Sequence, residues 1–279
     1  DSTLIATYIN KNLIKKAYTL KYVDSNEFDE SKIAEKIADS CGLDLKICEF
    51  NFFNYDINFA AERQLKLVKY PFANSTILST DFLSNQASKD GIRMALIGDG
   101  GDELFGGYPR YKAMFLNELI KKSILFKLPV QAFKFIFDLV INYKFLKINK
   151  IINSKPNLER RLRALRLLIG LNNFEAHRIS HLYFNTSDLV NSKFESYAVI
   201  KEFDSFFDDK INSPFSSMMA DLQTWVPFNL NYSSDIASMN NNLEIRVPFL
   251  DKRILEFVSK ENIPTLNLNQ SKIILRKLL

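Results

Sequence analysis

The sequence has few of the residues that disulfide frameworks and metal sites require. It contains two cysteines, Cys41 and Cys48, and two histidines, His177 and His181. Two cysteines cannot form a disulfide framework, which is typical of a reducing compartment, and we expect both to be small buried apolar side chains. The two histidines are spaced as i and i+4 on a helix, but no third ligand is near in sequence. We therefore expect surface or capping histidines, not a metal site.

The sequence also lacks long apolar runs and low-complexity segments. No run approaches the roughly 20 apolar residues that a transmembrane helix requires. With 47% hydrophobic and 25% charged residues over 279 positions, the composition is that of a globular protein and excludes a disordered chain. No initiator Met or signal peptide precedes Asp1, and the chain stops within an amphipathic helical pattern at residues 273–279. We interpret it as a fragment, truncated at both ends, of a longer cytoplasmic protein.

Positive charge is concentrated in one part of the chain. Residues 110–166 contain 14 Lys or Arg and three Asp or Glu, a net charge of +11, whereas the whole chain has +5. Such a stretch can bind nucleic acid or an anionic membrane surface. The basic residues recur at helical spacing between apolar ones, and no aromatic–basic RNA-binding motif is present. Solvated helix faces are the simpler interpretation, and we expect no nucleic-acid partner.

The first hundred residues alternate between helical and strand periodicity. Helices are expected at residues 2–15, 29–40, 56–68 and 77–88, and strands at 16–22, 45–50 and 92–97. This alternation predicts an α/β fold with a parallel sheet, in which the short apolar run at 92–97 is a buried strand. From about residue 108 onward the pattern is helical. Because ligands of such sheets bind beyond the carboxyl ends of the strands, the loop after Ile97 is the first candidate site.

This loop is rich in glycine and in carboxylates. Five of the eight glycines of the chain lie within ten residues, in the segment GDGGDELFGGYPRY at 98–111. A glycine-rich turn from a strand into a helix directs backbone N–H groups at an anion. Asp99, Asp102 and Glu103 would repel a phosphate there, and Mg²⁺ bridging carboxylate and phosphate oxygens is the simplest resolution. The alternative is a tight turn with acidic residues at a helix start. Neither a Walker-type GxxxxGKS or GxxxxGKT motif nor a dinucleotide-binding GxGxxG motif is present.

Several blocks together resemble the synthetase domain of the glutamine-dependent asparagine synthetases. The glycine-rich segment resembles the hallmark of that family, and ASM at 237–239 with LEIRVPFLD at 243–251 is similar to its ASM…LExRVPFLD signature. Lys272 with ILR at 274–276 is similar to its K-x-I-L-R helix. Asp1-Ser2 match the end of its SGGxDS pyrophosphate loop, and KYPFANS at 69–75 matches its DEPFxDPS segment more loosely. The blocks occur in family order along the whole chain.

The resemblance implies a fold, a reaction and a set of partners. The fold would be an α/β core of the ATP-pyrophosphatase type over residues 1–108, with a parallel Rossmann-like (HUP-like) sheet that lacks its first strand and SGG loop. Residues 109–279 would be the helical portion of the same domain. A carboxylate, aspartate in the best-known members, would attack the α-phosphorus of ATP to give an acyl-adenylate and Mg-pyrophosphate. Ammonia from glutamine, delivered by an N-terminal glutaminase domain of the parent chain, would displace AMP. A homodimer is possible, and the fragment alone would be inactive.

Residues at matching positions acquire roles from this resemblance. Asp1 and Asp102 would bind Mg²⁺, and Asp99 and Asp102 would be catalytic. The implied ATP-binding residues are Asp1, Ser2, Leu20, Gly98, Asp99, Gly100 and Gly101. Ser2 would donate to a phosphate, and the backbone of Leu20 would contact adenine. Asp99 occupies a position where many members have Glu, and it would orient or deprotonate the attacking ammonia.

Four further residues are candidates for substrate contact or structural support: Glu103, Asp235, Glu244 and Arg246. Glu103 is expected to stabilise a helix start, and Glu244 and Arg246 to pair with each other or with the glycine-rich helix. Asp235 matches an acidic position in the KVDRASM stretch of the family, but Ser233 and Ile236 replace the cations beside it. The acceptor therefore stays open between aspartate and another acid, such as a sugar uronate of a surface polysaccharide. A non-catalytic scaffold or anionic-surface binder is the alternative from a different class.

Overall fold

The structure, a computed structural model, describes two compact units of the chain. The described residues are 1–9, 12–23, 29–51, 76–122, 213–260 and 271–279, with the isolated positions 56, 58, 62, 65, 66, 68, 74 and 177. Unit 1 comprises Asp1–Gly101, Trp225–Asn262 and Leu275–Leu279, and unit 2 comprises Asp102–Thr224 and Ile263–Ile274. The domain boundary expected near residue 108 stays a prediction. Most of the basic stretch at 110–166 lies outside the described residues.

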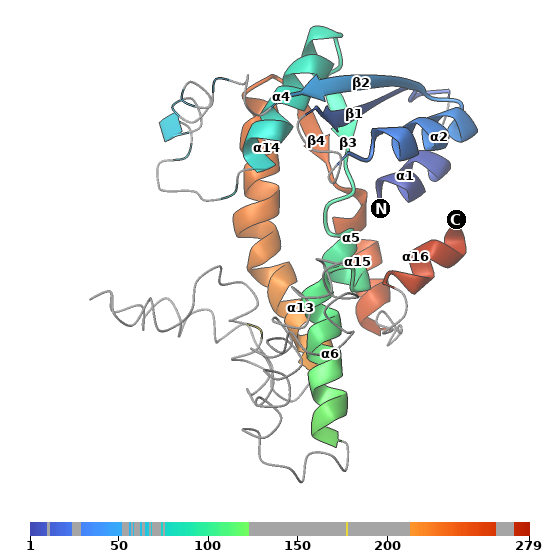
Figure 1. The fold of residues 1–279 in the computed structure, drawn as a ribbon, viewed down its shortest axis with the longest axis vertical. Coiled ribbons are helices and arrows are strands. Elements are labelled where there is room, and N and C mark those ends of the chain that lie inside the picture. The colour runs from blue at the N-terminus through green and yellow to red at the C-terminus, as the bar shows by residue number, and fades with distance from the viewer. Residues whose placement is uncertain are drawn as a thin grey trace, which may run out of the picture. The chain divides into compact units, whose positions relative to one another are not determined.

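Unit 1 begins with a parallel strand–helix–strand arrangement. Strands β1 (Lys16–Tyr22) and β2 (Asp44–Phe50) pair in parallel, with Lys16 opposite Asp44 and Tyr22 opposite Phe50. The connecting helix α2 (Ser31–Cys41) ends at Gly42, whose φ of 66° is the left-handed conformation that glycine adopts readily at a helix C-terminus. Helix α1 (Ser2–Tyr8) packs beside α2, as Figure 1 shows. Ala38, Cys41 and Leu43 form the buried cluster between these elements.

A second strand pair in unit 1 joins segments that are far apart in the sequence. Strand β3 (Met94–Leu96) pairs in parallel with β4 (Glu244–Arg246). Helix α4 (Thr76–Lys89) precedes β3, and helix α14 (Tyr232–Met239) precedes β4. The two helices lie side by side (Figure 1), with Ala237 packed in a buried cluster with Ile77 and Leu78. The two paired strands β3 and β4 each follow one of two helices that pack on each other.

The remaining elements are helical. Unit 1 also contains the π-helix η2 (Val226–Asn231), the 3₁₀-helix η3 (Pro248–Leu250) and α15 (Lys252–Lys260). In unit 2, α6 (Pro109–Lys122) packs against α13 (Ser213–Gln223). Helices α5 (Gly101–Phe105) and α16 (Ile273–Leu278) continue across the division between the units. Within the described residues, no helix combines the length and the apolar character needed to cross a membrane.

The chain is thus mixed α/β and rich in helices, with short parallel strands that are compatible with a Rossmann-like fold. The strands expected at 16–22 and 45–50 and the helices expected at 29–40 and 77–88 are confirmed to within two residues. The burial of Cys41 and Cys48 is confirmed as well.

Four expectations about helices and strands differ from the structure or lie mostly outside the described residues. The helix expected at 2–15 ends at Tyr8, because Ile9 takes an extended conformation with ψ of 151°. The strand expected at 92–97 is shorter and not buried, since 47% of Met94 is exposed. Strand β4 interrupts the half that was expected to be helical. The helix expected at 56–68 lies mostly outside the described residues.

Candidate functional site

The glycine-rich loop begins where β3 ends. The Ile97 N–H donates to the Arg246 carbonyl oxygen at 3.0 Å, which extends the β3–β4 pairing by one residue. Gly100 has a φ of 84°, and a Cβ atom there would collide with the side chain of Leu250. Any other residue at this position would meet both a backbone penalty and a steric clash. The loop therefore needs this glycine to turn from β3 into α5.

Asp1 and Ser2 lie directly against the same loop within unit 1. A Cβ atom added to Gly98 would lie 2.8 Å from Asp1 Cβ and 2.9 Å from the Ser2 backbone nitrogen. A Cβ atom added to Gly101 would lie 2.5 Å from Asp1 Cγ. These close approaches are possible only because both positions are glycine. Residues that are about one hundred positions apart, and that sequence reasoning assigned to one ATP-binding site, are thus in contact.

Asp99 follows Gly98 in this loop and is half-buried. Its Oδ2 atom accepts a hydrogen bond from the Ser234 hydroxyl at 3.0 Å. Ser234 belongs to α14, and sequence reasoning did not select it. No local pattern distinguishes this serine from Ser233 beside it, and only the packing of α14 near the end of β3 identifies it.

The other expected residues of unit 1 lie on neighbouring elements. Leu20 is a half-buried residue in the middle of β1, and Asp235 is exposed on α14. Arg246 Nε donates to Glu244 Oε1 at 2.8 Å, and both side chains are more than half exposed. Since β4 contains both residues, their pairing adds an ion pair to the solvent-facing side of the strand. Screening by water makes such an exposed pair weak.

In unit 2, Asp102 is paired with a lysine. Lys272 Nζ lies 2.7 Å from Asp102 Oδ1, and only 18% of the lysine side chain is exposed. The cation next to this carboxylate in the structure is therefore an ammonium group. Among the described residues, no group of three or more His, Cys, Asp and Glu side chains is placed to hold a metal ion. A divalent ion at Asp102 would have to share its carboxylate with Lys272 or displace the lysine.

Glu103, the next residue of α5, is fully buried in unit 2. Burial raises the pKa of its carboxyl group to about 7, and the nearby Tyr108 and Arg110 side chains only partly oppose that rise. Glu103 lies in the first turn of α5, and its expected role in stabilising the helix start stays a prediction. Its burial indicates a role in the packing around α5.

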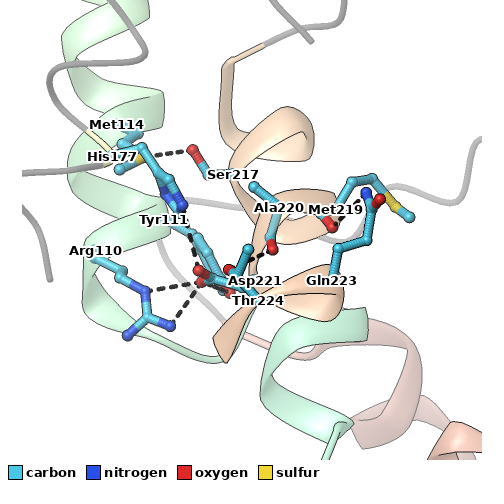
Figure 2. Close-up of polar contacts among 10 residues, drawn as sticks. All are labelled: Arg110, Tyr111, Met114, His177, Ser217, Met219, Ala220, Asp221, Gln223 and Thr224. Carbon is cyan, nitrogen blue, oxygen red and sulfur yellow. Dashed lines mark hydrogen bonds and ion pairs between the residues drawn. The ribbon is translucent and has the colours of Figure 1, made fainter. Parts of the chain in front are cut away.

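Unit 2 also contains a buried polar network that sequence reasoning missed, as Figure 2 shows. Asp221 of α13 is fully buried, and its Oδ2 atom accepts hydrogen bonds from Arg110 Nη2 at 2.7 Å and from the Tyr111 hydroxyl at 2.5 Å. His177 Nε2 lies 3.3 Å from Asp221 Oδ1. His177 is fully buried, so the expectation of a surface histidine is wrong for it. His181 lies outside the described residues.

A sequence signal for part of this network was available. Arg110 and Tyr111 stand at the end of the glycine-rich hallmark segment, whereas Asp221 is the one charged residue of helix α13. A single carboxylate within a buried helical face needs a buried cation or hydroxyl as its partner. That rule predicts a partner for Asp221 but not which residue supplies it.

Comparisons with known proteins agree with these motifs. The whole chain, residues 1–279, matches the family described as asparagine synthase. It is 27% identical over 211 residues to the glutamine-hydrolyzing asparagine synthetase 1 of Bacillus subtilis, covering 74% of this chain and 31% of that protein. It is also 23% identical to the amidase chyE of Penicillium rubens over 260 residues, and 23% identical to the amidase chry2 of Gibberella zeae over 257 residues. Each of these two alignments covers 89% of this chain and 37% of the relative.

No solved structure matches the chain. The chain spans about a third of the length of the curated relatives that it matches. The family match nevertheless extends from the first residue to the last and includes the glycine-rich loop, the Asp1-Ser2 segment that contacts it and the β4 segment that pairs with β3. The chain therefore belongs to the asparagine synthase family.

Proposed function

We propose that this chain is the synthetase portion of an ATP-dependent amidotransferase, which activates a carboxylic acid and converts it to an amide. Family membership supports the class of reaction. The observation that carries the proposal is the contact of Asp1 and Ser2 with Gly98 and Gly101. Because glycine has no side chain, the backbone at Gly98 and Gly101 can approach a ligand as closely as it approaches Asp1 and Ser2. A phosphate-binding loop likewise needs a backbone that can approach its ligand closely, which supports the proposal.

In the first step, an oxygen of the acceptor carboxylate attacks the α-phosphorus of ATP. A carboxylate–phosphorus bond forms and the bond to the β-phosphate oxygen breaks, so the products are an acyl-adenylate and pyrophosphate. The Ser2 hydroxyl and the Gly98 backbone would orient the phosphates. Leu20 in β1 is the proposed backbone contact for adenine.

Charge neutralisation of the pyrophosphate is the chemistry that a bound Mg²⁺ ion supplies. Asp1 and Asp102 are the carboxylates that would hold it. The donor set suits a hard cation, since carboxylate oxygens are the ligands that Mg²⁺ prefers. The pairing of Lys272 with Asp102 is consistent with a site where positive charge is favourable. Lys272 would then remain available to interact with the phosphates.

In the second step, ammonia attacks the acyl carbon of the adenylate. A carbon–nitrogen bond forms, the bond from the acyl carbon to the AMP phosphate oxygen breaks, and one proton leaves the nitrogen. The Asp99 carboxylate is the proposed acceptor of that proton and passes it to water. Acid–base assistance of this kind is worth about 10²- to 10⁴-fold in rate. Ammonia would come from glutamine through a glutaminase domain elsewhere in a cytoplasmic full-length protein.

The acceptor acid has two candidates. Aspartate is favoured by the similarity to a protein named as an asparagine synthetase. Another acid, such as a sugar uronate, is favoured by Ser233 and Ile236, which stand where the family motif has cations. Fewer cations near the exposed Asp235 would weaken the binding of a substrate with two carboxylates. The two candidates make opposite predictions for a substrate panel.

The test uses the full-length protein with Mg-ATP, ammonium and either aspartate or a panel of sugar acids. AMP and pyrophosphate release are measured together with the amide product by mass spectrometry. The proposal expects acid-dependent AMP formation that is lost in Asp102→Ala and retained in Glu256→Gln, a surface carboxylate on α15. Absence of AMP release with every acid would contradict the proposed reaction. Release with a sugar acid alone would exclude aspartate as the acceptor.

A further inference from the structure

We propose that Ser234 is a positioning residue that holds the Asp99 carboxylate in place for the amide-forming step. The inference rests on the proposed function, in which Asp99 takes a proton from the attacking nitrogen. The supporting contact is the hydrogen bond from Ser234 Oγ to Asp99 Oδ2 at 3.0 Å, which links residues 135 positions apart within unit 1. Both residues are half-buried, so water competes less for this bond than it does at the surface.

The helix that carries Ser234 is fixed firmly. Asn241, two residues after the end of α14, is buried and donates from Nδ2 to Asp81 Oδ1 at 2.8 Å and to the Ala237 carbonyl oxygen at 2.8 Å. Asp81 lies on α4 and is itself buried. Ala237, which is completely buried, packs against α4 in the same region. Ser234 therefore lies on a helix whose position is set by both packing and buried hydrogen bonds.

The loop that carries Asp99 is tied to the same helix through the strand pair. After α14, the chain turns at Asn242, which has a φ of 55°, and enters β4. Strand β4 pairs with β3, and the last hydrogen bond of this pairing, from Ile97 N–H to the Arg246 carbonyl oxygen, lies only two residues before Asp99. The backbone thus determines the separation of Ser234 and Asp99. Both side chains are short, so little rotamer entropy is lost when they meet.

The chemistry of the bond fits a positioning role. A hydroxyl donor stabilises the ionised form of a carboxylate, which is the form that accepts a proton. Fixing Oδ2 also fixes the plane of the carboxylate and the direction in which Oδ1 points. Errors of about 1 Å in the position of a reacting group can reduce a rate by as much as 10²-fold. Asp99 occupies a position where many family members have the longer glutamate. A hydrogen bond from another residue therefore contributes more to the placement of its carboxylate.

The decisive experiment compares Ser234→Thr with Ser234→Val in the full-length protein. The two side chains have nearly the same shape and the same branching at Cβ, but only threonine has a hydroxyl. Ser233→Ala is the matched control, because the hydroxyl of the adjacent Ser233 bonds to the Leu230 carbonyl oxygen of the preceding turn. Two steps are measured separately: ATP–pyrophosphate exchange without ammonia, which reports adenylation, and kcat and KM for ammonia in amide formation. The acceptor is the acid that supports AMP release in the assay above.

We expect Ser234→Val to lower kcat for amide formation about tenfold, while exchange changes by less than about twofold. Ser234→Thr and Ser233→Ala should retain both steps. Adding Ser234→Val to Asp99→Asn should cause little further loss, because the two residues act as one unit.

Two results would overturn the inference while leaving the proposed function intact. In the first, Ser234→Val has the same rates as the wild-type protein. In the second, Ser234→Val and Ser234→Thr lose exchange, amide formation and thermal stability together, which would indicate a structural tether between the helix and the loop. Absence of pyrophosphate exchange in the wild-type protein would overturn both proposals, and it is seen before any variant is compared.

Discussion

Arg110→Ala should be among the most destabilising single substitutions in unit 2. The Arg110 guanidinium donates from Nε and Nη2 to Asp221 Oδ2 at 3.1 and 2.7 Å. Only 16% of the Arg110 side chain and none of the Asp221 side chain is exposed. Truncating Arg110 removes two hydrogen bonds to the Asp221 carboxylate in the interior of unit 2, where the Tyr111 hydroxyl and His177 also lie against it. An uncompensated buried charge is costly, since desolvation is no longer offset.

The size of the effect follows from that geometry. Removing one partner of a buried ion pair costs about 3–5 kcal/mol in the free energy of unfolding. The Arg110 side chain also lies 4.0 Å above the Tyr108 ring, a cation–π contact worth a further 0.5 kcal/mol or so. For proteins of this size, 1 kcal/mol shifts the melting temperature by about 2–4 °C. A fall of at least about 6 °C is therefore expected.

The assay is thermal and urea unfolding followed by circular dichroism, with Arg253→Ala as the matched control. Arg253 also makes two hydrogen bonds to a carboxylate, donating from Nε to Asp251 Oδ1 at 2.9 Å and from Nη2 to Asp251 Oδ2 at 3.1 Å. Its side chain is 89% exposed. Water solvates both ions of that pair once it is broken, so the melting temperature of Arg253→Ala should stay close to that of the wild-type protein. Equal melting temperatures for the two variants would refute the argument that burial decides the cost.

Three further predictions use other parts of the structure. Gly98→Ala should abolish ATP binding measured by calorimetry, because the new Cβ would lie 2.8 Å from Asp1 Cβ. The control Gly42→Ala has open space around its Cβ and should retain binding, but its φ of 66° should lower the free energy of unfolding by about 1 kcal/mol. Burial and the hydrogen bond to Asp90 raise the pKa of Tyr18 to about 12. The neutral phenol therefore stabilises the fold fully below pH 10 and loses that contribution as the pH rises toward 12, so Tyr18→Phe should show a smaller alkaline loss of stability in melting curves. Arg246→Ala, which breaks only the exposed pair with Glu244, should change the free energy of unfolding by less than about 1 kcal/mol in urea titrations.

Local patterns were sufficient to predict the elements whose ends have their own signals. Strand β1 was predicted at its observed bounds, and the helix predicted to end at residue 40 ends at Cys41, just before Gly42. The three-residue strand β4 carries no such signal, because Glu244–Arg246 becomes a strand through pairing with β3 about 150 residues earlier. Periodicity within one segment cannot report a partner at that distance.

The same distinction between local and distant signals applies to the residues of the candidate site. The glycines and carboxylates of the loop after β3 could be selected from the sequence as a candidate anion and cation site, whereas the roles of Asp99 and Asp102 rest on the family resemblance. Partners could not be predicted, because they come from other elements. Lys272 was identified only as part of a helix motif, yet it pairs with Asp102, and His177 was expected at the surface, yet it lies against Asp221 in the interior.

The residues that sequence reasoning missed nevertheless share a physical property that explains their importance. Ser234, Lys272 and Asp221 each contact a charged group that is at least half-buried. In the interior a charged side chain must be matched by a donor or an opposite charge, so each carboxylate or guanidinium that a motif places there requires a second residue. The motif residues therefore determine where partners are needed, and the packing of distant helices determines which residue supplies them. On this argument, variation among relatives at Ser234 should follow variation at Asp99 more closely than variation in the glycines, because the bond joins side chains and the glycines serve the backbone.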